Sequence, residues 1–292
     1  VKSNDSATEF DLCSYLQEKY ELEQSRDPDQ LLGHKLDKFS KIQNTLDGIQ
    51  PGLYVIAAET NIGKTAFLTN LFLDLVESND VSGIYFSMDD HMDNIIDKLN
   101  GIKTGLVLNQ MKKQQKNEPD QIKLNEANQY LQGLAADKRI QIYDQRYCNH
   151  MNQIKELADK QDKPFFLAID GIFNVGVGHY STKREENIER ANQLKMLADV
   201  YRIPVIGTAE VRKSVQKNQT DRKLSLDDVM ETAKYVYNAN LVWLLTEIDE
   251  GSLSLKYAKN KLSSFKKNQA LIFEPQHGLI HENQTLSILE LI

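Results

Sequence analysis

The sequence predicts an α/β protein with a mostly parallel, twisted sheet, helices on both faces of the sheet and an antiparallel extension near its C-terminal end. Apolar runs of strand length alternate with segments whose apolar residues recur at helical spacing, which is typical of a parallel sheet. Several runs are apolar throughout, as expected for strands covered on both faces. The expected strands are residues 53–58, 83–88, 139–143, 165–170, 205–209, 241–245 and, in the antiparallel extension, 254–258 and 270–274.

The segments between these strands each carry one apolar stripe, which predicts amphipathic helices. Residues 112–120 interrupt this pattern as a polar loop, and residues 185–201 form the longest expected helix. The stripes consist of Phe67, Leu68, Leu71 and Leu75; Met92, Ile95, Ile96 and Leu99; Leu124, Ala127, Leu131 and Leu134; Met151, Ile154, Leu157 and Ala158; and Ile188, Ala191, Leu194 and Ala198.

Residues 1–45 are expected to form an N-terminal helical arm or linker, and residues 46–292 one main domain. A short helix near residues 10–16 precedes a linker at 25–30, and residues 31–46 form a second amphipathic stretch. The arm is too small to fold alone. Its helix either packs on its own core or docks on a neighbouring subunit.

The composition is that of a soluble protein without a global basic charge. The 292 residues include 35 Lys and Arg against 42 Asp and Glu, a net charge of −7, so any nucleic-acid site must be local. Two distant cysteines, Cys13 and Cys148, suit a reducing cytosol. The chain has no apolar run near 18 residues and no signal-peptide pattern, so we expect a cytoplasmic protein with no membrane contact. Because the sequence begins with Val1 and not with Met, it leaves open whether further residues precede Val1.

The segment GLYVIAAETNIGKT, residues 52–65, predicts a phosphate-binding loop between a buried strand and a helix. Backbone N–H groups of such a loop and the helix dipole favour an anion at one point. Lys64 would reach the β- and γ-phosphates, and the Thr65 hydroxyl would bind Mg²⁺. Ala58 replaces the first glycine of the usual pattern. The expected ATP-binding residues are Thr60, Asn61, Ile62, Gly63, Lys64, Thr65 and Ala66.

Acidic residues follow three of the predicted strands, at the edge of the sheet where ligands of such sheets bind. Asp170 is placed to hold Mg²⁺ through water. Asp89 or Asp90 could orient an attacking water, although a helix begins there and a capping role is an equal alternative. Glu210 would reach a γ-phosphate if its strand lies next to that of Asp170.

Basic residues gather in three further places. Lys259 and Lys261, two apart at a strand end, would share one face, which suits either a phosphate contact or a solvated edge. Loops 176–184 and 212–223 suit nucleic-acid phosphates, although such loops are more often simply solvated. The expected nucleic-acid contacts are Lys183, Arg184, Arg212, Lys213, Lys217, Arg222 and Lys223.

From about residue 46 to 280, the sequence resembles the RecA-type motor domain of DnaB-like replicative DNA helicases. The phosphate loop with its alanine, GIYFSMDD, FFLAID, the long helix at 185–201 and the strand that follows it resemble the family's motifs in order and spacing. Asp228 and Glu231 match a motif before a buried strand, and LKYAKNK and LIFEP are similar to the last two strands. The resemblance implies a RecA-like P-loop ATPase domain over residues 46–292.

The resemblance also implies partners and roles. It implies an ATP- and Mg²⁺-dependent helicase or translocase in a homo-oligomeric ring, usually of six subunits, with single-stranded DNA in the channel and replication proteins as further partners. Asp89 would be the catalytic base, and Lys259 and Lys261 would reach the γ-phosphate of the adjacent subunit. Loops 176–184 and 212–223 would line the channel. The family's helical N-terminal domain, which contacts primase, has no counterpart in these residues.

Four residues depart from the family pattern around the γ-phosphate. Asp89 replaces a glutamate, Glu210 a glutamine, Lys261 an arginine, and Phe173 a frequent glutamine. Lys261 keeps the charge but loses the planar fork of arginine. These changes motivate an alternative, a RecA-like nucleotide-binding protein with weakened turnover that acts as an assembly or regulatory factor for a replication complex. A third alternative is a RecA-fold ATPase of recombination or signalling.

Overall fold

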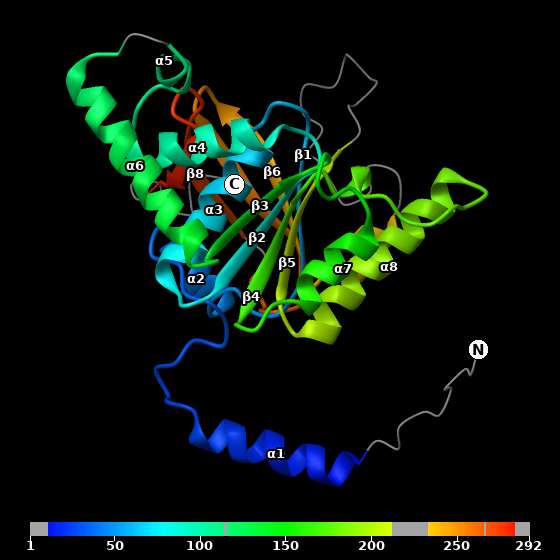
Figure 1. Cartoon of the computed structure of the whole chain (residues 1–292). Helices are drawn as coiled ribbons and strands as arrows, with labels where there is room; N and C mark the ends of the chain where they lie inside the picture. Colours follow the sequence, from blue (N-terminus) through cyan, green and yellow to red (C-terminus); the bar gives the residue numbers. More distant parts are fainter. Residues whose placement is uncertain (1–10, 114–115, 212–232, 266, 284–292) are drawn as a thin grey trace.

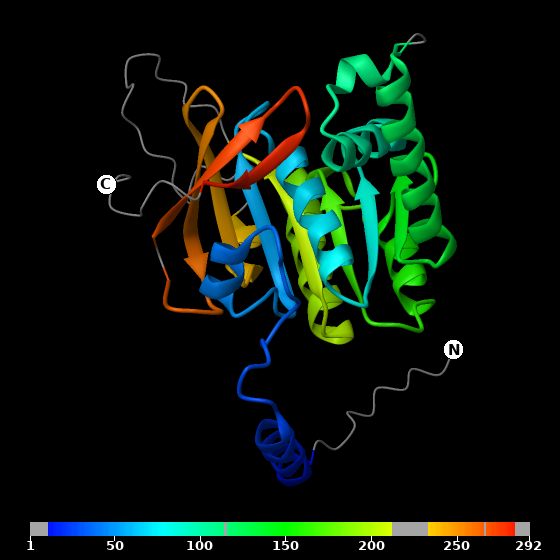
Figure 2. The same ribbon diagram turned by 90° about the vertical axis from the view of Figure 1, so that its left-hand side faces the viewer.

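The computed structural model describes residues 11–113, 116–211, 233–265 and 267–283. Within them, nine strands form one sheet in the order β3-β2-β4-β5-β1-β6-β7-β8-β9 (Figures 1 and 2). Neighbours from β3 to β6 pair in parallel, and β6 to β9 pair antiparallel. This arrangement confirms the α/β fold and its antiparallel C-terminal extension.

Each predicted strand is present, with small changes at the ends. The last strand, β9, was not expected, because a run of four residues with alternating burial is too short to show a period. The strands are β1 (Gly52–Ala58), β2 (Ser82–Ser87), β3 (Ile140–Asp144), β4 (Phe165–Asp170), β5 (Pro204–Glu210), β6 (Leu241–Asp249), β7 (Ser252–Asn260), β8 (Asn268–Glu274) and β9 (Leu279–Glu282).

Helices cover both faces of the sheet, as predicted (Figure 1). On one face lie α2 (Ser40–Leu46), α3 (Lys64–Ser78), α4 (Met92–Thr104) and α6 (Glu118–Ala136), and on the other α7 (Met151–Asp159), α8 (Lys183–Tyr201) and α9 (Ala233–Asn238). Helix α8 begins two residues earlier than expected, because Thr182 and Glu185 form a capping box. A short α5 (Leu108–Met111) was not predicted.

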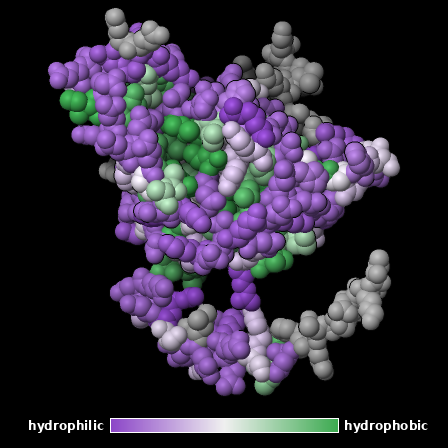
Figure 3. Space-filling model, viewed as in Figure 1, coloured by the Kyte–Doolittle hydropathy of each residue, from purple (hydrophilic) through white to green (hydrophobic). Residues whose placement is uncertain are grey.

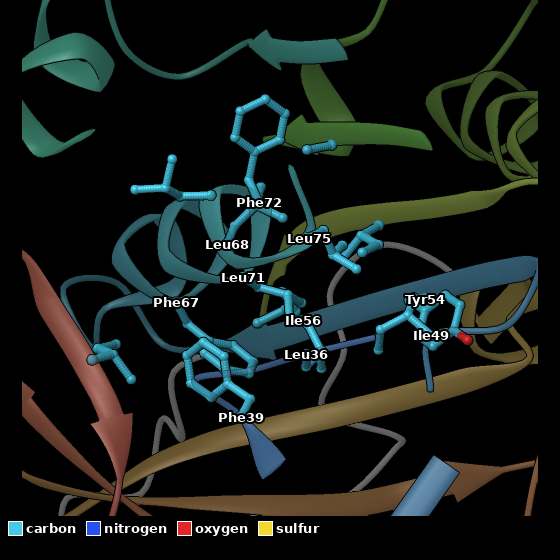
Figure 4. Packing of buried hydrophobic residues seen from close by; sticks show 14 of the residues in the cluster. Leu36, Phe39, Ile49, Tyr54, Ile56, Phe67, Leu68, Leu71, Phe72 and Leu75 are labelled. Atoms are coloured by element: carbon cyan, nitrogen blue, oxygen red, sulfur yellow. The ribbon is translucent and has the colours of Figure 1, made fainter. Parts of the chain in front are cut away.

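Strand β1 joins the two cores, because its side chains alternate between the faces. Tyr54 and Ile56 pack with α3, whereas Leu53, Val55 and Ala57 belong to the opposite cluster. Figure 4 shows Phe67 and Leu71 of α3 lying over β1. All five β1 side chains are completely buried, so the strand that leads into the phosphate loop is held rigidly from both sides.

The N-terminal segment divides into an exposed helix and a buried stretch. Helix α1 (Leu12–Ser25) lies apart from the sheet and its helices (Figures 1 and 2). By contrast, Leu36, Phe39 and Ile42 are buried in the same core as α3, and the Phe39 and Phe67 rings lie 5.6 Å apart. The second amphipathic stretch was expected to span residues 31–46, but its helix covers only Ser40–Leu46.

This packing bears on the domain boundary. Because residues 36–46 complete the core under α3, we propose that the domain begins near residue 36 and that the arm is correspondingly shorter than residues 1–45. Asp74 of α3 supports this boundary, since its carboxylate accepts hydrogen bonds from the backbone N–H groups of Asp37 and Lys38 at 3.1 and 3.0 Å.

Most of the surface is hydrophilic on the side of the molecule that Figure 3 shows, with hydrophobic patches in its middle. An apolar hollow of about 380 Å³ lies where α4, α6 and the edge strand β3 meet. Its lining includes Met92, Ile96, Leu131 and Ile142. Among the described residues, no helix combines the length and the apolarity that crossing a bilayer requires.

Candidate nucleotide-binding site

The strand order brings the predicted acids to the phosphate loop. Strand β5 lies between β1 and β4, with Glu210 in register with Ala58, the residue where the loop begins. On the other side, Asp170 of β4 is in register with Ser87 of β2. The condition set for Glu210, that its strand must neighbour that of Asp170, is therefore met. All these groups lie at the carboxyl ends of parallel strands, where α/β sheets bind ligands.

The phosphate loop has the backbone shape of an anion site. Asn61 and Gly63 adopt left-handed conformations, with φ of 69° and 106°, and α3 begins directly afterwards at Lys64. Such a turn directs successive N–H groups to one point, next to the positive end of the helix dipole. A Cβ on Gly63 would lie 3.0 Å from the Phe273 ring, so glycine meets both a conformational and a steric requirement.

Lys64 is buried across the loop. Its Nζ donates hydrogen bonds to the backbone carbonyls of Ala58 at 3.2 Å and Glu59 at 2.9 Å. Burial lowers the pKa of the ammonium, while the nearby carboxylates of Glu210, Asp170 and Asp89 act in the opposite direction. An anionic ligand would therefore gain a strong interaction here, because the cation has already lost much of its hydration.

Asp170 has the geometry of a metal-binding carboxylate. Its Oδ1 accepts a hydrogen bond from the Thr208 hydroxyl at 2.7 Å, and the same hydroxyl accepts one from the Gly171 N–H at 2.7 Å. Its Oδ2 is buried and has no hydrogen-bond partner among the described residues. Burial raises the pKa of this carboxyl, opposed by the Thr208 and Thr65 hydroxyls. A buried carboxylate oxygen of this kind is stable when a cation approaches it.

These oxygens fit Mg²⁺. Asp170 and the Thr65 hydroxyl are hard oxygen donors, which this ion prefers. Among residues 11–113, 116–211, 233–265 and 267–283, no group of three or more His, Cys, Asp and Glu could hold a metal. One carboxylate and one hydroxyl suit Mg²⁺, which in nucleotide enzymes usually binds one or two carboxylates and completes its shell with water and ligand phosphates.

The two acids after β2 have different surroundings. Asp90 accepts hydrogen bonds from the His91 N–H and from the side chains of Asn94 and Lys98, which ties it to the start of α4, although the N-cap residue of α4 is His91 and this helix has no side-chain cap hydrogen bond. Asp89 lines the cleft and accepts a hydrogen bond from the Asn174 amide. Burial is the main cause of its raised pKa, and Glu210 adds to the shift. Asp89 is therefore the better placed acid for a role in the cleft.

A cleft of about 920 Å³ is lined by the predicted phosphate-loop residues together with Asp89 and Glu210, while the buried Asp170 is not part of its lining. Glu210 lines it beside the loop and accepts a hydrogen bond from the Thr60 hydroxyl at 3.2 Å. Phe173 also lines it, and its ring packs edge-on against Tyr235 of α9 with centroids 4.9 Å apart. Of the predicted site residues, those lining the cleft are Thr60, Asn61, Ile62, Gly63, Lys64, Thr65, Ala66, Asp89 and Glu210.

The predicted pair of lysines lies outside this cleft. Lys259 donates hydrogen bonds to the carbonyls of Val236 at 2.5 Å and Tyr237 at 2.8 Å, near the end of α9. Burial and the neighbouring Lys261 lower its pKa to about 8. Lys261 follows the last residue of β7 and is exposed, so strand alternation does not fix its direction. Their action on an adjacent subunit stays a prediction.

The predicted nucleic-acid residues are only partly described. Lys183 and Arg184 are exposed in the first turn of α8, where the Lys183 Nζ lies 3.2 Å from a Glu186 carboxylate oxygen. The other expected contacts, Arg212, Lys213, Lys217, Arg222 and Lys223, lie outside the described residues, as do Asp228 and Glu231.

Sequence reasoning missed four residues around the cleft. Thr208 supports Asp170, Asn174 holds Asp89, and Lys98 lines the cleft while pairing with Asp90 at 3.1 Å. Arg190 of α8 is buried and donates to the Val175 carbonyl at 2.6 Å, which fixes the loop after β4. No sequence signal singled out Arg190, because it lies beside the predicted stripe of Ile188, Ala191, Leu194 and Ala198 and not on it.

Comparison with known proteins agrees with this geometry. The DnaB-like helicase C terminal domain family matches residues 36–283. Two relatives named replicative DNA helicase DnaB, from Helicobacter pylori strains J99 and 26695, are 24% identical over 237 and 254 residues. These alignments cover 78% and 84% of this chain but 46% and 50% of the relatives. The chain thus spans about half the length of the curated relatives it matches.

Solved structures agree on the fold. One of them, described as an ATPase domain, superposes with a TM-score of 0.82 at 19% identity, covering 95% of this chain and all of that domain. A DnaB-like replicative helicase, solved in a study of its interactions with primase, gives a TM-score of 0.80 at 18% identity and covers 94% of this chain and 69% of the other.

Proposed function

Because the chain belongs to the DnaB-like helicase C-terminal domain family, we propose that it is an ATP-hydrolysing motor that moves along single-stranded DNA during replication in the cytoplasm. The observation that carries this proposal is the buried, unpartnered oxygen of Asp170, which lies behind a cleft lined by its neighbours Gly171 and Thr208 and by Lys64 and Thr65 of the phosphate loop. A buried carboxylate and a desolvated ammonium together match a nucleotide phosphate with its divalent cation.

In this proposal, different residues of the chain bind the phosphates, hold Mg²⁺ and activate the attacking water. The loop amides and Lys64 bind the phosphates, and Thr65 and Asp170 hold Mg²⁺, which would offset negative charge on the phosphates. Asp89 orients the attacking water and accepts its proton, a role that the raised pKa of its carboxyl favours. The Asn174 amide fixes the direction of the Asp89 carboxylate. Glu210 contacts the region of the γ-phosphate from β5.

We propose that the active form is a ring of identical subunits, with six as the expected number. Helix α1 supports assembly, because it lies away from its own domain and exposes Leu12, Tyr15, Leu16 and Tyr20 by 42 to 63%. An isolated helix gains most of its stability from packing an apolar face, so a neighbouring subunit is a natural partner. Lys261 is exposed and would reach the cleft of an adjacent subunit, whereas Lys259 is held by α9 and positions the strand end.

Single-stranded DNA would contact the first turn of α8 and the loop at residues 212–223. Lys183 and Arg184 are exposed there, next to the loop that follows the Asp170 strand. Phosphate contacts of this kind do not need a basic protein overall, which agrees with a net charge of −7.

The direct test is steady-state ATP hydrolysis with and without single-stranded DNA. Wild-type protein should hydrolyse ATP faster when DNA is present, and Lys64→Ala should abolish hydrolysis. Lys35→Ala is the matched control, because Lys35 is exposed and its Nζ pairs with Asp37 at 2.7 Å, on the arm side of the core. Absence of hydrolysis in both conditions, with nucleotide binding unaffected by Lys64→Ala, would remove the proposal.

One observation favours a second candidate, a nucleotide-binding assembly factor with weakened turnover. The Glu210 carboxylate lines the cleft beside the loop, where it adds negative charge close to the expected polyphosphate. Asp89→Glu combined with Lys261→Arg separates the two candidates. A large gain in hydrolysis rate would indicate a site whose turnover has been reduced, and an unchanged rate would favour the motor as it stands.

A further inference from the structure

A second lysine, Lys98, lies in the nucleotide cleft and belongs to no phosphate-loop motif. It comes from α4, the helix that follows Asp89 and Asp90, and its side chain is 20% exposed. The Lys98 Nζ lies 3.1 Å from the Asp90 Oδ2, and its stem packs near the turn between β8 and β9, since a Cβ on Gly278 would lie 3.7 Å from the Lys98 Cγ. Lys98 therefore lines the cleft from a position between Asp90 and the turn that joins β8 and β9.

The cleft is lined by more carboxylates than cations, so the position of Lys98 matters for the binding of an anion. Among the described residues that line the cleft, Lys64 and Lys98 are the two cations, against the carboxylates of Asp89, Glu210, Glu247 and Glu250. A triphosphate brings further negative charge into this space. Charges enclosed by low-dielectric walls interact more strongly than charges in water, so each cation in the cleft has a large influence on anion binding.

The partner of Lys98 can release it at low cost. The Asp90 carboxylate also accepts hydrogen bonds from the His91 N–H at 2.9 Å and the Asn94 amide at 2.5 Å. Both contacts are to Oδ1 and would remain if the ammonium moved, and Oδ2 could turn to water, because the Asp90 side chain is 32% exposed. Lys98 also acts on the metal-binding acid, because its charge contributes to lowering the pKa of Asp170 against the effect of burial.

We propose that Lys98 is a second phosphate-binding cation, supplied by the same subunit, which exchanges its ion pair with Asp90 for the terminal phosphate of a bound nucleoside triphosphate. This inference rests on the proposed function and adds a residue to it. Lys98 then distinguishes triphosphate from diphosphate, because only the triphosphate has a group in reach. The terminal phosphate would then also affect the position of α4 and of Asp89, which lies between β2 and α4.

The test is equilibrium binding of ADP and of a non-hydrolysable ATP analogue, both with Mg²⁺, to Lys98→Met, Lys98→Arg and Asp90→Asn. Lys98→Met should weaken analogue binding about tenfold or more, since a charge-assisted contact is lost, and leave ADP affinity unchanged. Lys98→Arg should keep most of the preference for the analogue. Asp90→Asn breaks the same ion pair but leaves the ammonium, so it should keep or increase the preference.

The outcomes separate this inference from the function on which it rests. If Lys98→Met and Asp90→Asn lose thermal stability alike and neither changes the ratio of analogue to ADP affinity, the ion pair only fixes α4 and the inference is wrong. In that case the proposed function still stands, provided that ADP binds to the wild type and that Lys64→Ala abolishes this binding. If neither nucleotide binds to the wild type, both proposals fall together.

Discussion

Replacing Thr208 by valine should weaken both the fold and the metal site. The Thr208 hydroxyl donates to Asp170 Oδ1 and accepts from the Gly171 N–H, both at 2.7 Å, and all three groups are buried. Valine has nearly the same shape, so the packing changes little. Leaving one buried amide and one carboxylate oxygen without this partner should cost about 3 kcal/mol at neutral pH, since each unsatisfied group costs roughly 1 to 3 kcal/mol.

The loss should depend on pH with a definite sign. The folded pKa of Asp170 is raised above its unfolded value of 3.8, and the Thr208 hydroxyl holds it lower than burial alone would. A raised carboxyl pKa means that folding is favoured below the unfolded value and loses stability as pH rises through the folded value. Thr208→Val raises the pKa further, so its cost should shrink as pH falls towards 3.8 and Asp170 becomes protonated.

Urea unfolding of wild type, Thr208→Val and the control Thr246→Val at several pH values measures this effect. Thr246 is a half-buried threonine of β6, so its valine variant reports the cost of the substitution itself. The Thr208 variant should also melt about 6 to 12 °C lower, since 1 kcal/mol corresponds to roughly 2 to 4 °C in a domain of this size. Equal losses in the two variants, or a loss that grows as pH falls, would refute the reasoning.

Three further predictions follow from the same geometry. Gly171→Ala should reduce ATP hydrolysis at least about tenfold, because φ is +84° and the added Cβ would overlap an Asp89 carboxylate oxygen; unchanged kinetics would show that Asp89 is not needed where it stands. Lys259→Ala should lower the free energy of unfolding in urea by about 1 kcal/mol, because two hydrogen bonds are lost. Lys261→Ala should leave this free energy unchanged and lower only the hydrolysis rate. The reverse pattern would show that Lys261 has the structural role and Lys259 the role in hydrolysis. Deleting residues 11–25 should leave the melting temperature unchanged but reduce the assembled mass in analytical ultracentrifugation, and an unchanged mass would remove α1 from the interface.

The expected strands and the phosphate loop followed from the sequence because their signals are local. A run such as FFLAID is apolar at every position but the last, and the loop before Lys64 needs only adjacent residues to form its anion site. The same locality explains two omissions, because β9 and α5 have only four residues each and show no period.

Only the tertiary structure decided which side chains meet in the cleft. Strand order placed Thr208 beside Asp170, and the loop after β4 carried Asn174 to Asp89, contacts between residues 38 and 85 positions apart. The burial of Phe39 under α3 likewise depends on a neighbour that the local pattern does not contain. A sequence period fixes which face of an element is apolar, but side-chain pairing depends on how distant elements pack against each other, and that packing also brought Lys98 to the cleft.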